Sequence, residues 1–204
     1  GNSTGTELNK AYTPTGVFVD SNGNIYISED DNHRVTKWTP GATEGVVVAG
    51  GSAGSGTDDL NSPYDVFVVS DTIYVSDKAN NRVMKWNPNA SAGTVVAGGN
   101  GSGENLNQTY GPSGIFVDSD KNLYVAEAFN HRVTKWSPGA TEGVVVAGGN
   151  GNGTDLDELS QPLGIYVDDN KNVYVASQGQ DWISNWAPGA TEGVIVAGGN
   201  GGGN

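Results

Sequence analysis

The sequence has no cysteine, only two histidines and few basic residues, and each shortage excludes a class of protein. Without cysteine the chain can form neither a disulfide framework nor a thiolate metal site. The chain contains ten lysines and arginines and 23 aspartates and glutamates, which gives a net charge of −13. Because nucleic-acid affinity depends on basic side chains that displace counterions from phosphate, we expect no nucleic-acid partner.

Long apolar runs are also missing. No stretch approaches the roughly 20 apolar residues of a membrane-spanning helix, so we expect no membrane insertion. The chain begins at Gly1 without a starting Met and shows no signal peptide, and we expect processing at that end. What it has in excess is glycine, 32 of 204 residues, placed between short runs of valine, isoleucine, tyrosine and tryptophan. Such runs are typical of strands joined by tight turns.

Two markers repeat with a common period of about 50 residues. They are a proline and a tryptophan, found at Pro14, Pro63, Pro112 and Pro162 and at Trp38, Trp86, Trp136 and Trp186. The first copy contains four short apolar segments, at 16–20, 24–28, 34–38 and 46–49. We therefore predict an all-β fold, a β-propeller with four four-stranded antiparallel blades. The single domain spans 1–204, with blades at about 1–51, 52–99, 100–149 and 150–204.

The repeated segments resemble a known family. Each copy reads approximately Pro-x-Gly-[VI]-[FY]-Val-Asp, then Asn-[ILV]-Tyr-[IV], then Asn-His-Arg-Val-x-Lys-Trp, as in Asn32–Val35 and Asn130–Val133. This pattern resembles the NHL repeat, and the resemblance covers the whole chain. It implies a propeller but leaves function open, because propellers of this family bind protein, bind RNA or, in one branch, act as enzymes.

The enzymatic branch holds a metal in the central channel with several histidines, whereas this sequence has His33 and His131 alone. We expect both to hydrogen-bond the loop before the third strand, and we expect no catalytic residue, no metal and no cofactor. We expect each third-strand arginine to pair with a carboxylate, Glu29, Asp77 or Glu127. The motif residues given a structural role are Asn32, His33, Arg34, Trp38, Arg82, Trp86, Asn130, His131, Arg132, Trp136 and Trp186.

Acidic turns such as 20–24, 118–122 and 168–172 resemble the opening of a calcium loop, but an apolar residue stands where that loop needs glycine. We interpret them as hairpin turns. Sequons for N-glycosylation occur at Asn2, Asn89, Asn100, Asn107 and Asn152, chiefly in glycine-rich connections. Chance sequons are common in such a composition, but with the acidic surface they favour an extracellular or cell-surface glycoprotein.

The fourth copy departs from the others, with Gln180, Asp181 and Trp182 replacing Asn-His-Arg. Drift of a terminal repeat is one interpretation, and an interaction surface anchored by an exposed Trp182 is the other. Relatives usually close with six blades, and this chain encodes four. Either the four blades close on themselves, which we expect, or the ends meet another copy in a ring or filament.

The sequence thus predicts a non-enzymatic extracellular interaction or structural module. It would bind through its loop faces or self-assemble through its blade ends, with a protein, a glycan or its own copies as partners. One alternative is a lectin-like, glycan-binding propeller, suggested by the repeated Asn, Asp and Trp loops. The other is a metal-dependent, lyase-like enzyme of the resembled family.

Overall fold

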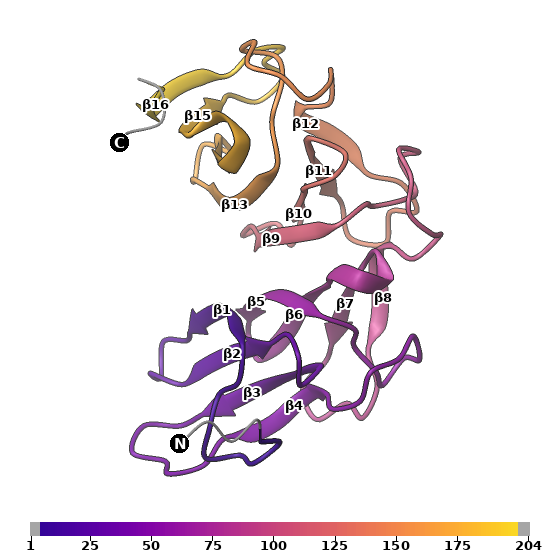
Figure 1. Cartoon of the computed structure of the whole chain (residues 1–204), viewed down its shortest axis with the longest axis vertical. Coiled ribbons are helices and arrows are strands. Elements are labelled where there is room, and N and C mark those ends of the chain that lie inside the picture. Colours follow the sequence, from indigo (N-terminus) through magenta and orange to yellow (C-terminus); the bar gives the residue numbers. More distant parts are fainter. Residues whose placement is uncertain (1–4, 200–204) are drawn as a thin grey trace.

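The computed structural model of this protein describes residues 5–199 and contains four four-stranded antiparallel sheets (Figure 1). Each sheet keeps its strands in sequence order, as in a propeller blade. The predicted all-β fold is confirmed, and helix within the described residues is limited to two 3₁₀ turns, Lys78–Asn80 and Gln178–Gln180. Among residues 5–199 there is no helix that is long and apolar enough to cross a bilayer.

The blades have closely matched strand lengths. Blade 1 comprises β1 (Pro14–Val19), β2 (Ile25–Glu29), β3 (Arg34–Trp38) and β4 (Val46–Gly50). Blade 2 comprises β5 (Pro63–Val69), β6 (Thr72–Asp77), β7 (Arg82–Trp86) and β8 (Thr94–Gly98). Blade 3 comprises β9 (Pro112–Val117), β10 (Leu123–Glu127), β11 (Arg132–Trp136) and β12 (Val144–Gly148). Blade 4 comprises β13 (Pro162–Val167), β14 (Val173–Ser177), β15 (Trp182–Trp186) and β16 (Val194–Gly198).

The first strands β1, β5, β9 and β13 form the inner edge, where each contacts the first strand of the next blade. The glycine of the Pro-x-Gly motif allows this close approach. A Cβ added at Gly114 would lie 2.4 Å from the carbonyl oxygen of Leu163 in blade 4. A Cβ at Gly16 would lie 2.7 Å from the Cα of Asp65 in blade 2. These distances are shorter than van der Waals contact, so the motif glycine is required for the close approach of the next blade at Gly16 and Gly114.

The hydrophobic core lies between the blades. We call the side of a blade that looks toward the next blade its forward face, and the opposite side its backward face. In blade 3, Val117 and Trp136 of the backward face pack on blade 2, and Tyr124 and Val133 of the forward face pack on blade 4. An interior blade therefore buries both faces, which explains its near-continuous apolar strands.

The four blades form an open arc, with the first and last blades at opposite ends (Figure 1). The expectation that the chain closes on itself is therefore wrong. The bulk of the tryptophan, tyrosine and phenylalanine side chains between blades holds neighbouring sheets apart at a set angle. With four blades, that angle does not add up to a full turn.

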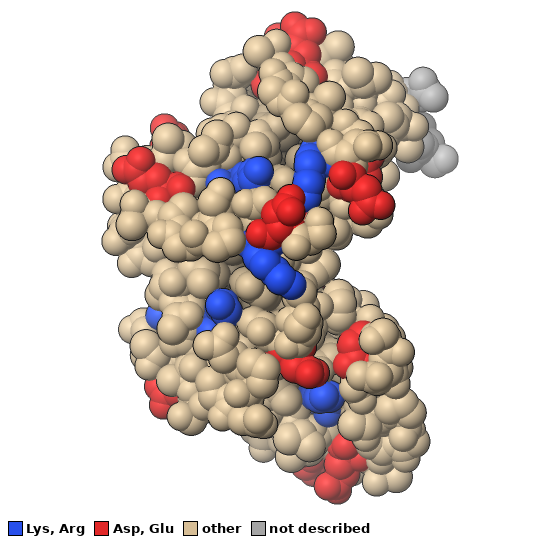
Figure 2. Space-filling model, turned by 180° about the vertical axis from the view of Figure 1, so that it is seen from behind, with Lys and Arg blue, Asp and Glu red and all other residues tan. Residues whose placement is uncertain are grey.

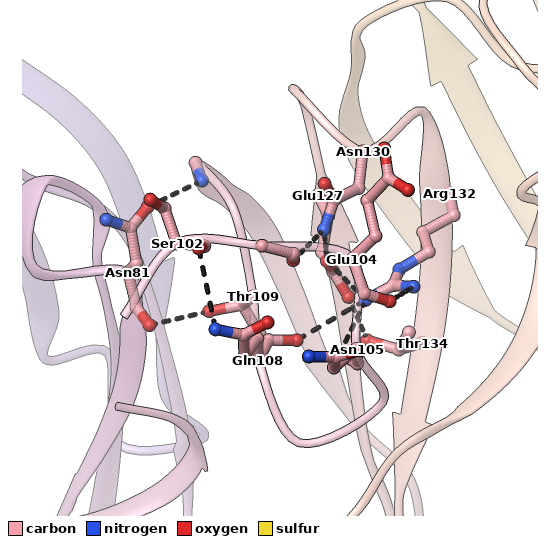
Figure 3. A network of polar contacts seen from close by, with 12 residues as sticks. Asn81, Ser102, Glu104, Asn105, Gln108, Thr109, Glu127, Asn130, Arg132 and Thr134 are labelled. Carbon is pink, nitrogen blue, oxygen red and sulfur yellow. Dashed lines mark hydrogen bonds and ion pairs between the residues drawn. The ribbon is translucent and has the colours of Figure 1, made fainter. Parts of the chain in front are cut away.

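A buried ion pair joins the second and third strands of the first three blades, as expected from the sequence. The N–O distances are 3.0 Å for Arg34–Glu29, 2.6 Å for Arg82–Asp77 and 3.1 Å for Arg132–Glu127. Arg132 also donates to the carbonyl oxygens of Glu104, Asn105 and Gln108 (Figure 3). The pair thus ties the connection that enters each blade to its central strands. These pairs keep their charges away from the protein surface.

Candidate functional site: the two unpartnered blade faces

The backward face of blade 1 is one of the two blade faces that no blade of this chain covers. It presents Val17, Val19 and Ile25, whose side chains are 66%, 57% and 40% exposed. Their counterparts in blade 3, Ile115, Val117 and Leu123, are 3–4% exposed. A shallow cavity of about 400 Å³ lies on this face, lined by residues that include Ile25, Ile27, Trp38 and Pro40. We call this surface the blade 1 end face.

The forward face of blade 4 is the other uncovered surface, which we call the blade 4 end face. Tyr166 is 58% exposed, Ile183 38% and Val196 50%. The counterpart of Ile183 in each of the three preceding blades is fully buried. A cavity of about 400 Å³ is lined here by residues that include Leu163, Ala176, Asp181, Trp182 and Ile183. The two end faces are thus the two halves of one inter-blade interface, exposed at opposite ends of the arc.

The divergent residues of the fourth repeat do not share one environment. Gln180 is 7% exposed and donates from Nε2 to the carbonyl oxygens of Gly153 and Glu158, so it lies within blade 4. Asp181 is exposed and Trp182 half-buried, and both line the cavity of the blade 4 end face. Trp182 occupies the position of the buried arginine, while Ser177 occupies that of its carboxylate partner. The charged pair is therefore replaced on both sides.

An aromatic ladder runs along the inner edge and ends at the blade 4 end face. The ring centroids of Phe18 and Phe67, and those of Phe67 and Phe116, are 4.9 Å apart. Phe116 and Tyr166 are 5.4 Å apart. Each blade contributes one ring from the equivalent position, and each pair bridges two blades. The sequence shows the four aromatic positions, but only the blade arrangement shows that they touch.

The histidines join neighbouring blades. Nδ1 of His33 accepts a hydrogen bond from the backbone N–H of Ser62, at 3.1 Å, and Nδ1 of His131 accepts from Gln161, at 3.2 Å. In blade 2, Oδ1 of Asn81 accepts from Gly111 in the same way, as Figure 3 shows for the Asn81 region. The expected structural role is present, but the expected partner is wrong. The bonded loop precedes the first strand of the following blade.

The acidic turns close hairpins. Oδ1 of Asp20 accepts from the backbone N–H groups of Asn22 and Asn24, at 2.9 Å, and Oδ2 accepts from the Asn24 side chain. The bond from the Asn24 side chain lowers the pKa of Asp20. Both carboxylate oxygens are thus used within the turn. Between residues 5 and 199, the structure groups no three histidine or acidic side chains in a way that could hold a metal ion.

The sequon asparagines differ in accessibility. Asn89, Asn100 and Asn152 are exposed, and Asn107 is half-buried, with its carbonyl oxygen accepting from the Asn100 side chain. Asn2 lies outside the described residues. Figure 2 shows acidic side chains in several separate places over the surface and basic ones nearer the middle of the arc. Lys37 and Lys135 lie over the rings of Tyr26 and Tyr124, at 5.3 and 5.8 Å from the ring centroids.

Asp65 is an acidic residue at a glycine position. The other blades have Gly16, Gly114 and Gly164 there. Oδ2 of Asp65 accepts a hydrogen bond from the backbone N–H of Ile115 in blade 3, at 2.9 Å, and Oδ1 accepts from Val66. Withdrawal from water raises the pKa of Asp65 to about 6, against the opposing effect of these two donors. Apart from the departure from glycine, no feature of the sequence indicated this inter-blade contact.

Residues 12–38 match the NHL repeat family. The first repeat thus contains an NHL repeat, and the chain as a whole has the β-propeller fold. The family resemblance inferred from the repeats is therefore confirmed. A comparison with curated protein sequences gave no match.

Several solved structures share the fold. A gluconolactonase from Xanthomonas campestris matches with a TM-score of 0.68 and 17% identity, over 92% of this chain and 63% of its own. Virginiamycin B lyase from Staphylococcus aureus matches with a TM-score of 0.61 and 12% identity, over 93% and 58%. An auxiliary nutrient binding protein from Bacteroides ovatus matches with a TM-score of 0.66 and 15% identity, over 89% and 49%. This NHL-repeat chain thus spans about half to three fifths of their lengths, and the likeness extends to the fold alone.

Proposed function

We propose that this NHL-repeat chain is a non-enzymatic protein-interaction module that works outside the cell and binds through its two end faces. The observation that carries the proposal is the exposure of two large apolar surfaces whose interior counterparts are buried. Soluble proteins rarely leave contiguous apolar surface uncovered unless it binds something. The propeller fold supports this role at the level of a scaffold, since propellers present flat sheets and loops to partners.

The extracellular part of the proposal is supported by the exposed sequons at Asn89, Asn100 and Asn152. Intact mass before and after glycosidase treatment of material from the native source tests it. Loss of about one core glycan mass per occupied asparagine supports the compartment. Unmodified asparagines count against it.

Site-specific photo-crosslinking tests the interaction role. A crosslinking residue is introduced at Val17 or at Ile183, and at Val144 as the control. Val144 is 64% exposed, close to the 66% of Val17, but lies on the outer strand of an interior blade. We expect protein crosslinks from positions 17 and 183, mapped by mass spectrometry, and none above background from position 144. Equal crosslinking from all three positions would contradict the proposal.

Two other functions remain as alternatives with distinct outcomes. A metal-dependent, lyase-like enzyme is favoured by the shared fold with a lyase and a gluconolactonase. It requires stoichiometric zinc or calcium, which elemental analysis of the purified protein measures. A lectin-like module, which would use the Asn- and Asp-rich turns, requires saturable binding on a glycan array. Binding there that survives charge substitution of both end faces would replace the present proposal.

A further inference from the structure

We infer that the partner of each end face is a second copy of this chain, packed head to tail, so that the blade 1 end face of one copy covers the blade 4 end face of the other. This inference rests on the proposed interaction role. The template is the contact between neighbouring blades, which the chain makes three times. The same two kinds of face meet there, forward against backward, and bury both.

The aromatic ladder provides the first specific match. In each interior contact the ring of one blade contacts the ring at the equivalent position of the next in a tilted or edge-on arrangement. Tyr166 ends the ladder at the blade 4 end face and is 58% exposed. Phe18 begins it in blade 1 and is half-buried. Head-to-tail packing places Tyr166 of one copy against Phe18 of the other and continues the series.

The backbone provides the second match. At each interior contact, a turn residue with left-handed backbone accepts from the N–H of the residue that precedes the next blade's proline. The acceptors His33, Asn81 and His131 have φ of 51–52°. At the ends of the arc, Asp181 holds the acceptor position with φ 55°, and Thr13 holds the donor position with φ 44°. Both ends therefore already have the conformation that the contact requires, and a carboxylate oxygen of Asp181 replaces the His or Asn acceptor.

The number of blades indicates how many copies are involved. Propeller rings contain about four to eight blades. Two copies of this four-bladed chain supply eight blades, the upper end of that range. Two equivalent head-to-tail contacts then cover all four end faces in one ring. The charge of −13 on each chain opposes the association, so it is measured at about 0.15 M salt, where the Debye length is about 8 Å.

Light scattering coupled to size exclusion, over a series of concentrations, tests the inference. We expect a species of twice the 21.0 kDa chain mass. Val17→Asp and Ile183→Asp should each raise the dissociation constant by about 100-fold or more, because each buries an unpaired charge. Val144→Asp, at a similarly exposed valine away from both end faces, should leave it unchanged. A chain that stays monomeric, or a mass that grows without limit, overturns the two-copy ring.

Mixing the two variants separates head-to-tail packing from a symmetric contact. Val17→Asp retains an intact blade 4 end face, and Ile183→Asp retains an intact blade 1 end face. Each is expected to be monomeric alone, and together they should form a one-to-one pair. A contact between identical faces predicts instead that one variant assembles normally by itself, and that result overturns the inference.

Gly164→Ala is a second test that does not depend on the folding of the charged variants. The nearest heavy atom to its added Cβ is the Cβ of Ala176, at 3.8 Å, so the single chain accommodates it. At an interior contact the same addition, at Gly114, would meet the next blade at 2.4 Å. We expect Gly164→Ala to keep the wild-type circular dichroism and to lose assembly. Crosslinks from positions 17 and 183 to a different protein, with a monomeric chain, would leave the proposed function standing and overturn this inference.

Discussion

Replacing the buried ion pair of blade 3 with the residues of blade 4 should be far less damaging than replacing either member alone. Glu127 and Arg132 lie in an interior blade, with side chains 0% and 6% exposed. Glu127 also accepts from Thr134 at 2.7 Å and from Asn130 at 2.6 Å. Burial raises the pKa of Glu127, while the charge of Arg132 acts against that rise. The two charges are therefore held in the interior by each other.

The magnitude follows from this geometry. Glu127→Ser leaves the Arg132 guanidinium buried with carbonyl partners alone, and Arg132→Trp leaves the Glu127 carboxylate buried without its cation. Each single change should lower the free energy of unfolding by about 3–5 kcal/mol. The double variant contains the serine and tryptophan that blade 4 has at these positions, Ser177 and Trp182. It loses hydrogen bonds to the entering loop, each worth about 0.5–1.5 kcal/mol, but buries no charge. We expect a favourable coupling energy of about 2–3 kcal/mol.

Urea unfolding of the four proteins, followed by far-ultraviolet circular dichroism, completes the cycle. The exposed pair formed by Lys171 and Asp120, at 2.7 Å and with side chains 30% and 67% exposed, serves as the control. Its cycle, with Asp120→Ser and Lys171→Ala, should give about 1 kcal/mol or less. If the blade 3 substitutions are additive within about 0.5 kcal/mol, the reasoning that the charges are held in place by each other is refuted.

Three further predictions concern the contacts between blades. The pKa of Asp65 is about 6 in the folded chain, above the ordinary value of 3.8, so the free energy of unfolding should fall as pH rises from about 4 to 6 and this carboxyl ionises. Asp65→Gly should reduce that fall by on the order of 1–3 kcal/mol. If urea unfolding gives the same pH dependence of stability for both proteins between pH 4 and 6, the prediction is wrong. Gly114→Ala should lower the free energy of unfolding by about 1–3 kcal/mol, because its Cβ clashes with the carbonyl oxygen of Leu163. Gly164→Ala should leave the urea midpoint of the single chain nearly unchanged. Equal effects of the two substitutions would contradict the close-approach explanation. His131→Ala removes the acceptor for the backbone N–H of Gln161, which is exposed, and should lower the free energy of unfolding by about 0.5–1.5 kcal/mol. His131→Asn, which introduces the residue of blade 2, should partly restore the loss, and absence of rescue would mean that the imidazole contributes by packing rather than by this hydrogen bond.

The sequence alone determined the local organisation of this protein. Short apolar segments between glycine-rich turns indicated four strands per repeat, and the recurrence of Pro and Trp indicated four sheets. The pairing of Arg34, Arg82 and Arg132 with acidic residues also followed from the sequence, because each pair joins adjacent strands of one hairpin. These features depend on short-range geometry, which a strand pattern already contains.

Tertiary structure decided everything that depends on how one blade meets another. The angle between sheets left the arc open, where the sequence suggested closure. It also placed His33 against the following blade, set Asp65 between three blades and exposed the two end faces. Gln180 looked like part of a surface in sequence but lies within blade 4, because its amide bonds the loop that enters the blade. These contacts join residues 22 to 50 positions apart. Small rotations between packed sheets determine them, so no local sequence pattern predicts them.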